Sequence, residues 1–229
     1  MVDNPIFCAI DAADRARARS LAGAVRGLVN IKLGLEFFVA NGPAAIREVA
    51  GDAPLFLDLK LHDIPNTVAG AVRAATAIEP MLLTIHCSGG SAMLRAAVAA
   101  AAAAPGPRMK LIGVTVLTSL DDDDLAGVGQ QGPVAAQVRR LALLARGCGL
   151  DGVVCSPREV AMLRAACGPD FLLVVPGIRP AGAATGDQKR VMSPREALAA
   201  GADHLVIGRP ITEAPDPAAA ARAILAEVR

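Results

Sequence analysis

Eight short apolar runs alternate with segments of helical periodicity, and this alternation constrains the fold more than any other feature of the chain. The apolar runs cover residues 5–10, 28–31, 54–57, 81–85, 111–117, 152–155, 171–175 and 204–207. After each run, apolar residues recur at the spacing of a helix face. Strands that alternate with helices form parallel βαβ units. Strands that are uniformly apolar are covered on both faces.

Eight such units in 229 residues predict an α/β fold, a (β/α)8 TIM barrel that occupies residues 1–229 as a single domain. An open, doubly wound parallel sheet is the alternative. That fold would need a glycine-rich turn after the first strand. The chain has Ile10-Asp11-Ala12-Ala13 there, which contains no glycine. No linker or change in composition marks a second domain.

Composition excludes several classes of function. The net charge of +1 provides no electrostatic basis for binding nucleic acid or a membrane surface. No apolar stretch approaches the roughly 18 residues of a membrane span, and the N-terminal residues do not resemble a signal peptide. The five cysteines include no C-x-x-C pair, so we expect reduced packing residues rather than metal ligands. We therefore expect a cytoplasmic protein.

Polar side chains gather at one recurrent position, the C-terminal ends of the predicted strands. In a (β/α)8 barrel these ends form the face on which active sites are built. Scattered surface charges would not show this placement, so the pattern predicts a site at that face. The residues concerned are Asp11, Lys32, Asp58, Lys60, His86, Thr118, Arg179 and Arg209.

The stretch Asp58-Leu59-Lys60-Leu61-His62-Asp63-Ile64-Pro65-Asn66-Thr67 carries the densest chemistry. Charges at the end of a buried strand are rare unless they are paired. Because side chains of a strand alternate between faces, Asp58 and Lys60 should lie on the same side. Together with Lys32 and Asp63 they form an acid–base subset. A purely structural salt bridge is the alternative, and His62 and His86 are weaker candidates.

A second subset follows the seventh and eighth predicted strands. Barrels of this type often bind phosphate there through backbone N–H groups and a short helix. Glycine lets the backbone approach an anion closely, and arginine offers a fork that matches phosphate oxygens. This subset contains Gly177, Arg179, Gln188, Gly208 and Arg209. For Arg209, a surface salt bridge is the alternative interpretation.

These motifs together resemble the orotidine 5'-phosphate decarboxylase family in its bacterial form. Residues 58–67 match the family signature, and further segments agree in order and position from Asp11 to Thr212. Those segments are Ile31-Lys32-Leu33-Gly34, Val114-Thr115-Val116-Leu117-Thr118-Ser119, Pro176-Gly177-Ile178-Arg179-Pro180, Gly186-Asp187-Gln188-Lys189-Arg190-Val191 and Gly208-Arg209-Pro210-Ile211-Thr212. The resemblance implies conversion of orotidine 5'-phosphate to UMP and carbon dioxide in pyrimidine biosynthesis, with no metal or organic cofactor.

The resemblance also implies the roles of the catalytic residues. Lys60 would donate a proton to C6 of the pyrimidine. It would act within an alternating charge network that also contains Lys32, Asp58 and the partner chain's Asp63. The family forms homodimers with sites at the interface, and Thr67 would likewise reach across to the partner's site.

The remaining implied roles concern substrate binding. Asp11 and Lys32 would contact the ribose, and Thr118 lies in the segment that would hold the pyrimidine. The phosphate region would be held by Arg179, Gln188, the Gly208 backbone and Arg209. We also expect the loop of residues 177–190 to fold over the substrate, because it is long and rich in glycine and alanine.

Two other functions are open at this point. A related barrel that uses Mg²⁺ on a sugar phosphate, such as a keto-gulonate phosphate decarboxylase, shares part of the signature. The segments Gln188-Lys189-Arg190 and Pro176-Gly177-Ile178-Arg179 argue against it. The other alternative is a catalytically silent nucleotide-binding protein, against which the retention of both acids and both lysines argues.

Overall fold

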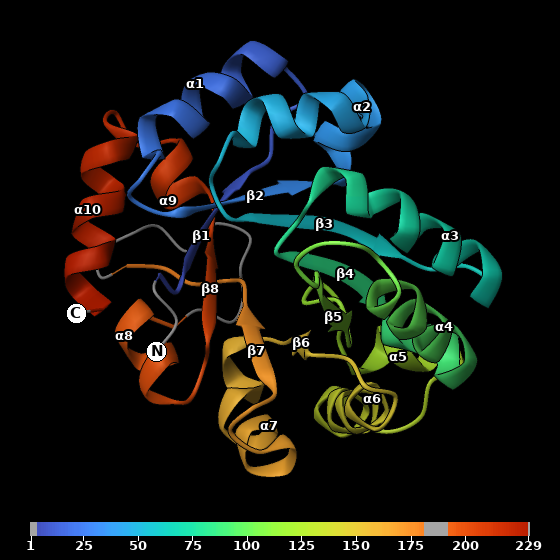
Figure 1. Cartoon of the computed structure of the whole chain (residues 1–229). Helices are drawn as coiled ribbons and strands as arrows, with labels where there is room; N and C mark the ends of the chain where they lie inside the picture. The colour runs from blue at the N-terminus through green and yellow to red at the C-terminus, as the bar shows by residue number, and fades with distance from the viewer. Residues whose placement is uncertain (1–3, 181–191, 229) are drawn as a thin grey trace.

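Eight parallel strands pair in sequence order and close into a barrel, because β8 also pairs with β1 (Figure 1). The computed structural model describes residues 4–180 and 192–228. The strands are β1 Ile6–Ile10, β2 Asn30–Gly34, β3 Leu55–Leu61, β4 Leu82–His86, β5 Lys110–Val114, β6 Gly152–Val154, β7 Leu172–Val175 and β8 His204–Ile207. The predicted TIM barrel is confirmed, and the open sheet was the wrong alternative because the sheet closes.

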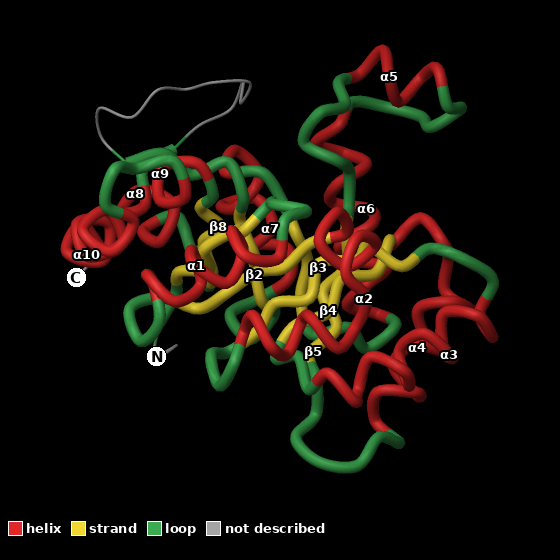
Figure 2. Tube along the Cα trace, turned by 90° about the horizontal axis from the view of Figure 1, so that it is seen from above, coloured by secondary structure: helices red, strands yellow, loops and turns green. Residues whose placement is uncertain are grey.

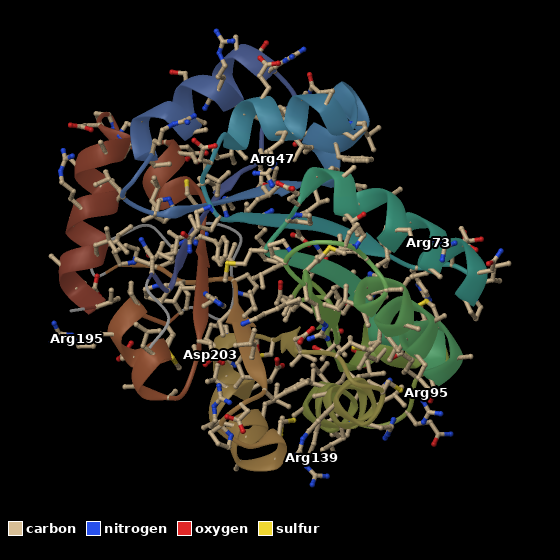
Figure 3. The ribbon with its side chains drawn as sticks, in the orientation of Figure 1. Arg47, Arg73, Arg95, Arg139, Arg195 and Asp203 are labelled. Carbon is tan, nitrogen blue, oxygen red and sulfur yellow. The ribbon has the colours of Figure 1, made fainter. Side chains whose placement is uncertain are left out.

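The helices form an outer layer around the strands (Figure 1). They are α1 Arg15–Val25, α2 Leu35–Ala50, α3 Pro65–Ala75, α4 Gly90–Ala102, α5 Asp122–Gly127, α6 Val134–Gly147, α7 Val160–Cys167, α8 Pro194–Ala199, α9 Arg209–Thr212 and α10 Pro217–Val228. Short 3₁₀ turns cover Thr76–Ile78, Cys87–Gly89 and Pro157–Glu159. Arginines such as Arg73, Arg95 and Arg139 point outward from this layer into solvent (Figure 3). None of the described helices combines the length and apolarity needed to cross a membrane.

Several helices begin at the polar residues that the sequence indicates. Ser193 and Glu196 form a capping box at the start of α8, and Ser156 and Glu159 do the same before α7. The latter pair opens a 3₁₀ turn first, and α7 follows it. The Asp121 side chain caps α5 in the same way, at the start of the acidic run of residues 121–124. Helix α5 stands away from the barrel (Figure 2), so such local bonds matter more there.

Two strands lie at other positions than the apolar runs indicate. The second strand begins and ends later than predicted, because Gly34 pairs with Asp58 of β3 and so belongs to the ladder. The fifth strand ends at Val114, although the apolar run continues. Val116 and Leu117 leave the ladder and line a cavity instead. The end of an apolar run thus need not belong to the strand that precedes it.

Apolar side chains fill the interior of the barrel below its C-terminal face. Phe7 and Phe56 lie at their centre, with ring centroids 5.6 Å apart in an edge-to-face arrangement. The same cluster includes Ala9, Leu82, Ile112, Val174 and Val206. A larger apolar cluster lies between the strands and the helices. The packed interior leaves the C-terminal face as the place where polar side chains can point into a cavity.

The five cysteines are free and buried, as predicted for packing residues. Burial raises the pKa of Cys8 and of Cys87 to about 12. Because the thiolate is the nucleophilic and metal-binding form, these two thiols are unreactive at neutral pH.

His204 is buried among the apolar side chains of the barrel and makes folding sensitive to pH. Its ring lies 5.2 Å from that of Phe7. Within the described part of the chain, its Nδ1 has no hydrogen-bond partner. Burial lowers the pKa of His204 to about 4. The unfolded chain, with a histidine pKa near 6.5, therefore binds a proton more readily than the folded chain.

We expect acid to destabilise the fold through His204. Stability from this group is complete above about pH 6.5 and is lost as the pH falls toward 4. Between pH 7 and pH 5 the loss is about 2 kcal/mol in the free energy of unfolding. Urea unfolding of the wild type and of His204→Leu at pH 7 and pH 5 measures this loss in the free energy of unfolding. The variant should lose less stability between them, and equal losses would contradict this assignment.

Candidate active site

A cavity of about 260 Å³ opens among the C-terminal ends of the strands. All eight strands or the turns that follow them border this face. The apolar part of its lining consists of Val114, Val116, Leu117, Val154, Val174 and Val206. Polar groups are contributed by Asp11, Lys32, Asp58, Lys60, Thr118, Arg179 and Arg209. Most of the residues that the sequence singled out thus surround one space.

Four charged side chains form a continuous chain of alternating sign along one side of the cavity. The Lys32 ammonium lies 3.2 Å from Asp11 Oδ1 and 3.3 Å from Asp58 Oδ2. Lys60 Nζ donates to both Asp58 oxygens, at 2.8 and 2.9 Å. The order is Asp11, Lys32, Asp58, Lys60, contributed by the ends of β1, β2 and β3. Asp58 is therefore bonded to two ammonium groups at once.

Burial makes these charges depend on one another. The Lys32 side chain is only 9% exposed. Burial alone would lower its pKa, but Asp58 and Asp11 outweigh that effect and raise it. Burial would likewise raise the pKa of Asp58, but Lys32 and Lys60 outweigh it and hold the value below its usual range. Lys32 and Asp58 are thus each held in the charged form at neutral pH by their oppositely charged neighbours.

Lys60 occupies an unusual backbone conformation. Its φ is +50°, in the left-handed region, which costs a residue other than glycine about 1 kcal/mol or more. The register of β3 against β4 shifts between Leu57 and Leu61, so the strand is irregular there. As the sequence indicates, the strand runs past Lys60 to Leu61, but its backbone is not regular there. The side chains of Asp58 and Lys60 nevertheless meet. Strain of this kind is concentrated at functional sites.

Thr84 belongs to the same cluster and was missed by the sequence argument. It lies in β4, and its hydroxyl donates to Asp58 Oδ1 at 2.9 Å. The Thr84 hydroxyl oxygen in turn accepts a bond from the Lys60 backbone N–H, also at 2.9 Å. The available signal was a single polar residue within the apolar run Met81-Leu82-Leu83-Thr84-Ile85.

The segments that follow β7 and β8 contribute arginines and glycines to the cavity. Arg179 is buried, and its backbone N–H donates to the carbonyl of Met192 at 3.0 Å. Gly177 has a φ of +76°, which favours glycine. Gly208 precedes α9, so its backbone and that of Arg209 lie at the start of a short helix. Gln188, and the predicted closing loop beyond Pro180, lie outside the described residues.

Asp63 and Thr67 are placed differently from the other candidates. Both are exposed, Asp63 in the turn after β3 and Thr67 in the first turn of α3. Asp63 Oδ1 accepts a bond from the backbone N–H of Ile64 at 2.6 Å. Neither Asp63 nor Thr67 is among the described residues that line the cavity. Thr118 is also exposed, but it does line the cavity.

The two weaker candidates pack against each other beside this site. The rings of His62 and His86 have centroids 5.3 Å apart. Burial, together with the charges of His62 and Lys60, lowers the pKa of His86. Neither ring is among the described groups that line the cavity. Across residues 4–180 and 192–228, no group of three His, Cys, Asp or Glu side chains is arranged to hold a metal ion.

Comparison with known proteins identifies the family. The profile of the orotidine 5'-phosphate decarboxylase / HUMPS family matches residues 4–224. The chain belongs to this family. A relative from Rhodospirillum rubrum, named orotidine 5'-phosphate decarboxylase, is 59% identical, and the match covers 100% of this chain and 95% of the relative. A relative of the same name from Thermobifida fusca is 54% identical, with 98% and 96% covered.

Solved structures of the family have the same barrel. The crystal structure of orotidine 5'-phosphate decarboxylase from Lactobacillus acidophilus superposes with a TM-score of 0.89 at 38% identity, and covers 99% of this chain and 100% of that one. The enzyme of the same name from Pyrococcus horikoshii gives 0.79 at 25% identity, with 98% and 99% covered. The resemblance drawn from residues 58–67 and the distant segments is thereby confirmed.

Proposed function

We propose that this chain decarboxylates orotidine 5'-phosphate to UMP and carbon dioxide, without a metal or organic cofactor. The observation that carries the proposal is the bonded chain Asp11–Lys32–Asp58–Lys60 along a cavity that Arg179, Gly208 and Arg209 also line. The charge network suits proton transfer, and the arginines with the Gly208 backbone suit a phosphate. The names of the relatives add the substrate.

Electrostatics is the main contribution that such a site can make. When the bond between C6 and the carboxylate breaks, its electron pair stays on C6 in the ring plane, with no conjugated sink. Lys60 places a cation next to that position and donates a proton to C6 as carbon dioxide leaves. The negative charge of Asp58 opposes the substrate carboxylate, and this repulsion ends when carbon dioxide departs. Preorganised charges of this kind need no reorganisation during the reaction.

The other groups of the site bind and orient the substrate. In this proposal Asp11 and Lys32 contact the ribose, and Thr118 lies at the pyrimidine. Arg179, Gln188, the Gly208 backbone and Arg209 hold the phosphate. Binding energy from the distant phosphate supports orientation at the reacting carbon.

Arg209→Ala should weaken binding of UMP and of substrate far more than it slows turnover at saturation. Losing one charge-assisted bond costs roughly 1.5–3 kcal/mol, or about tenfold to somewhat over a hundredfold in affinity. Calorimetric titration with UMP and steady-state kinetics measure the two effects. Arg139→Ala, on the exposed face of α6, is the matched control and should bind UMP normally. Unchanged UMP affinity in Arg209→Ala would contradict the phosphate assignment.

The proposal includes a homodimer with shared active sites. Asp63 and Thr67 are exposed, and neither is among the described residues that line the cavity of their own chain. This placement fits residues that contribute to a partner's site. Ile64 between them is 66% exposed, and Leu35 and Val39 at the start of α2 are 56% and 76% exposed. Exposed apolar side chains of this kind, in the segments that follow β2 and β3, suit burial against a second copy.

We place the enzyme in the cytoplasm. The five free cysteines, all buried, suit a reducing compartment. The substrate and product, both nucleotides, also fit a metabolic enzyme there.

The decisive experiment follows the loss of orotidine 5'-phosphate absorbance with the purified chain. The absence of Trp and Tyr keeps the absorbance of the protein itself low. Turnover that persists after treatment with a chelator supports the proposal. Loss of turnover with the chelator and recovery with Mg²⁺ would favour the sugar-phosphate barrels. Tight UMP binding without turnover would instead indicate a silent nucleotide-binding protein.

A further inference from the structure

Thr84 connects two groups of the charge network to a strand that contributes no charge of its own. Its side chain is fully buried in β4, at 0% exposure, and Leu82, two residues earlier, belongs to the apolar cluster inside the barrel. A hydroxyl buried in such a strand is unfavourable unless its bonds are made. Both are made here, since Thr84 donates to Asp58 and accepts from Lys60.

The bond to Asp58 orients its carboxylate. Asp58 Oδ1 accepts from both Thr84 and Lys60, whereas Oδ2 accepts from Lys32 and Lys60. The Thr84 hydroxyl is the one neutral donor among these described contacts, and it comes from the strand on the far side of β3 from Lys32. It therefore opposes rotation of the carboxylate toward either lysine.

The bond from the Lys60 backbone N–H to Thr84 pairs a donor that the strand ladder leaves without an acceptor. The register shift between β3 and β4 at Leu57 and Leu61 removes Lys60 from the regular ladder. Its N–H would then need another acceptor, because buried backbone donors are almost always paired. The Thr84 hydroxyl supplies it at 2.9 Å and so holds the residue whose φ is +50°.

We propose that Thr84 is a positioning residue, which holds the Asp58 carboxylate and the left-handed backbone of Lys60 in the arrangement that protonates the substrate. The inference rests on the proposed decarboxylase function, and it adds a specific task for β4. Thr84 is absent from the cavity lining among the described residues, so it acts through Asp58 and Lys60 rather than on substrate.

The test compares three variants. Thr84→Val keeps the shape but removes both bonds, and Thr84→Ser keeps the hydroxyl. Leu82→Val shortens a neighbouring inward side chain of the same strand without touching the network. We expect Thr84→Val to lower kcat about tenfold to a hundredfold while KM changes less than about threefold. Thr84→Ser should recover most of the rate, and Leu82→Val should keep it even if the barrel is less stable.

Amide hydrogen exchange at Lys60 provides a readout that does not depend on activity. Exchange should accelerate about tenfold or more in Thr84→Val, relative to global unfolding, and stay slow in the other two variants. Unchanged exchange would overturn the contact, and faster exchange with normal kcat would overturn its role in catalysis. If the wild type fails to turn over orotidine 5'-phosphate, the proposed function is wrong, and so is the proposed role of Thr84 in catalysis. The exchange result still decides whether Thr84 holds Lys60.

Discussion

Lys60→Ala should reduce turnover of orotidine 5'-phosphate by about a thousandfold or more while the barrel still folds. The variant removes the proposed proton donor, whose loss alone costs about a hundredfold or more. It also removes the cation next to the developing carbanion, and a preorganised electrostatic contact of that kind contributes another large factor. Single-turnover kinetics at saturating substrate measure the chemical step directly.

Binding and folding separate this loss from simple damage to the protein. Lys60 is 37% exposed at its side chain, so its removal leaves no large cavity. Lys32 continues to compensate Asp58. Circular dichroism and UMP binding should therefore remain close to those of the wild type. Lys110→Ala, an exposed lysine at the first residue of β5 and thus at the other end of the barrel, is the matched control. Normal turnover in Lys60→Ala would refute the catalytic assignment.

Heterodimers that combine Lys60→Ala in one chain with Asp63→Asn in the other should recover about half of the wild-type rate per dimer. Each variant alone should be nearly inactive. In the heterodimer one site carries both changes, whereas the other has Lys60 from one chain and Asp63 from its partner, both intact. Co-expression with two different affinity tags isolates this heterodimer for kinetic measurement.

A second heterodimer provides the control. Lys60 and Asp58 belong to the same chain's network, where they lie 2.8 Å apart. A dimer of Lys60→Ala with Asp58→Asn therefore contains no intact site and should stay inactive. If the Asp63 heterodimer also stays inactive, Asp63 serves its own chain and the shared site is wrong. Full activity of an isolated monomer would have the same consequence.

Much of the fold follows from local patterns. Apolar runs separated by helical periodicity specify strands and helices without knowledge of distant contacts. Capping residues such as Ser193 and Asp121 act on the backbone within a few positions, so they mark helix starts reliably. The limits of the second and fifth strands were less certain, because register with a neighbouring strand decides where pairing stops.

The placement of the site residues was also largely local. A residue directly after a parallel strand must lie at the C-terminal face, whatever its distant neighbours are. That rule brought Asp11, Lys32, Asp58 and Arg179 to one cavity. It gave no distances, since the spacing of side chains from different strands depends on barrel closure and register.

The sequence by itself determined the barrel, the face that carries the site and the family, because each rests on residue order and short-range periodicity. The tertiary structure decided that Lys32 lies between Asp11 and Asp58, since those three side chains come from three different strands. It also revealed the left-handed backbone of Lys60 and its bond to Thr84. Both depend on the irregular pairing of β3 with β4, a contact between segments distant in the chain that no local pattern encodes.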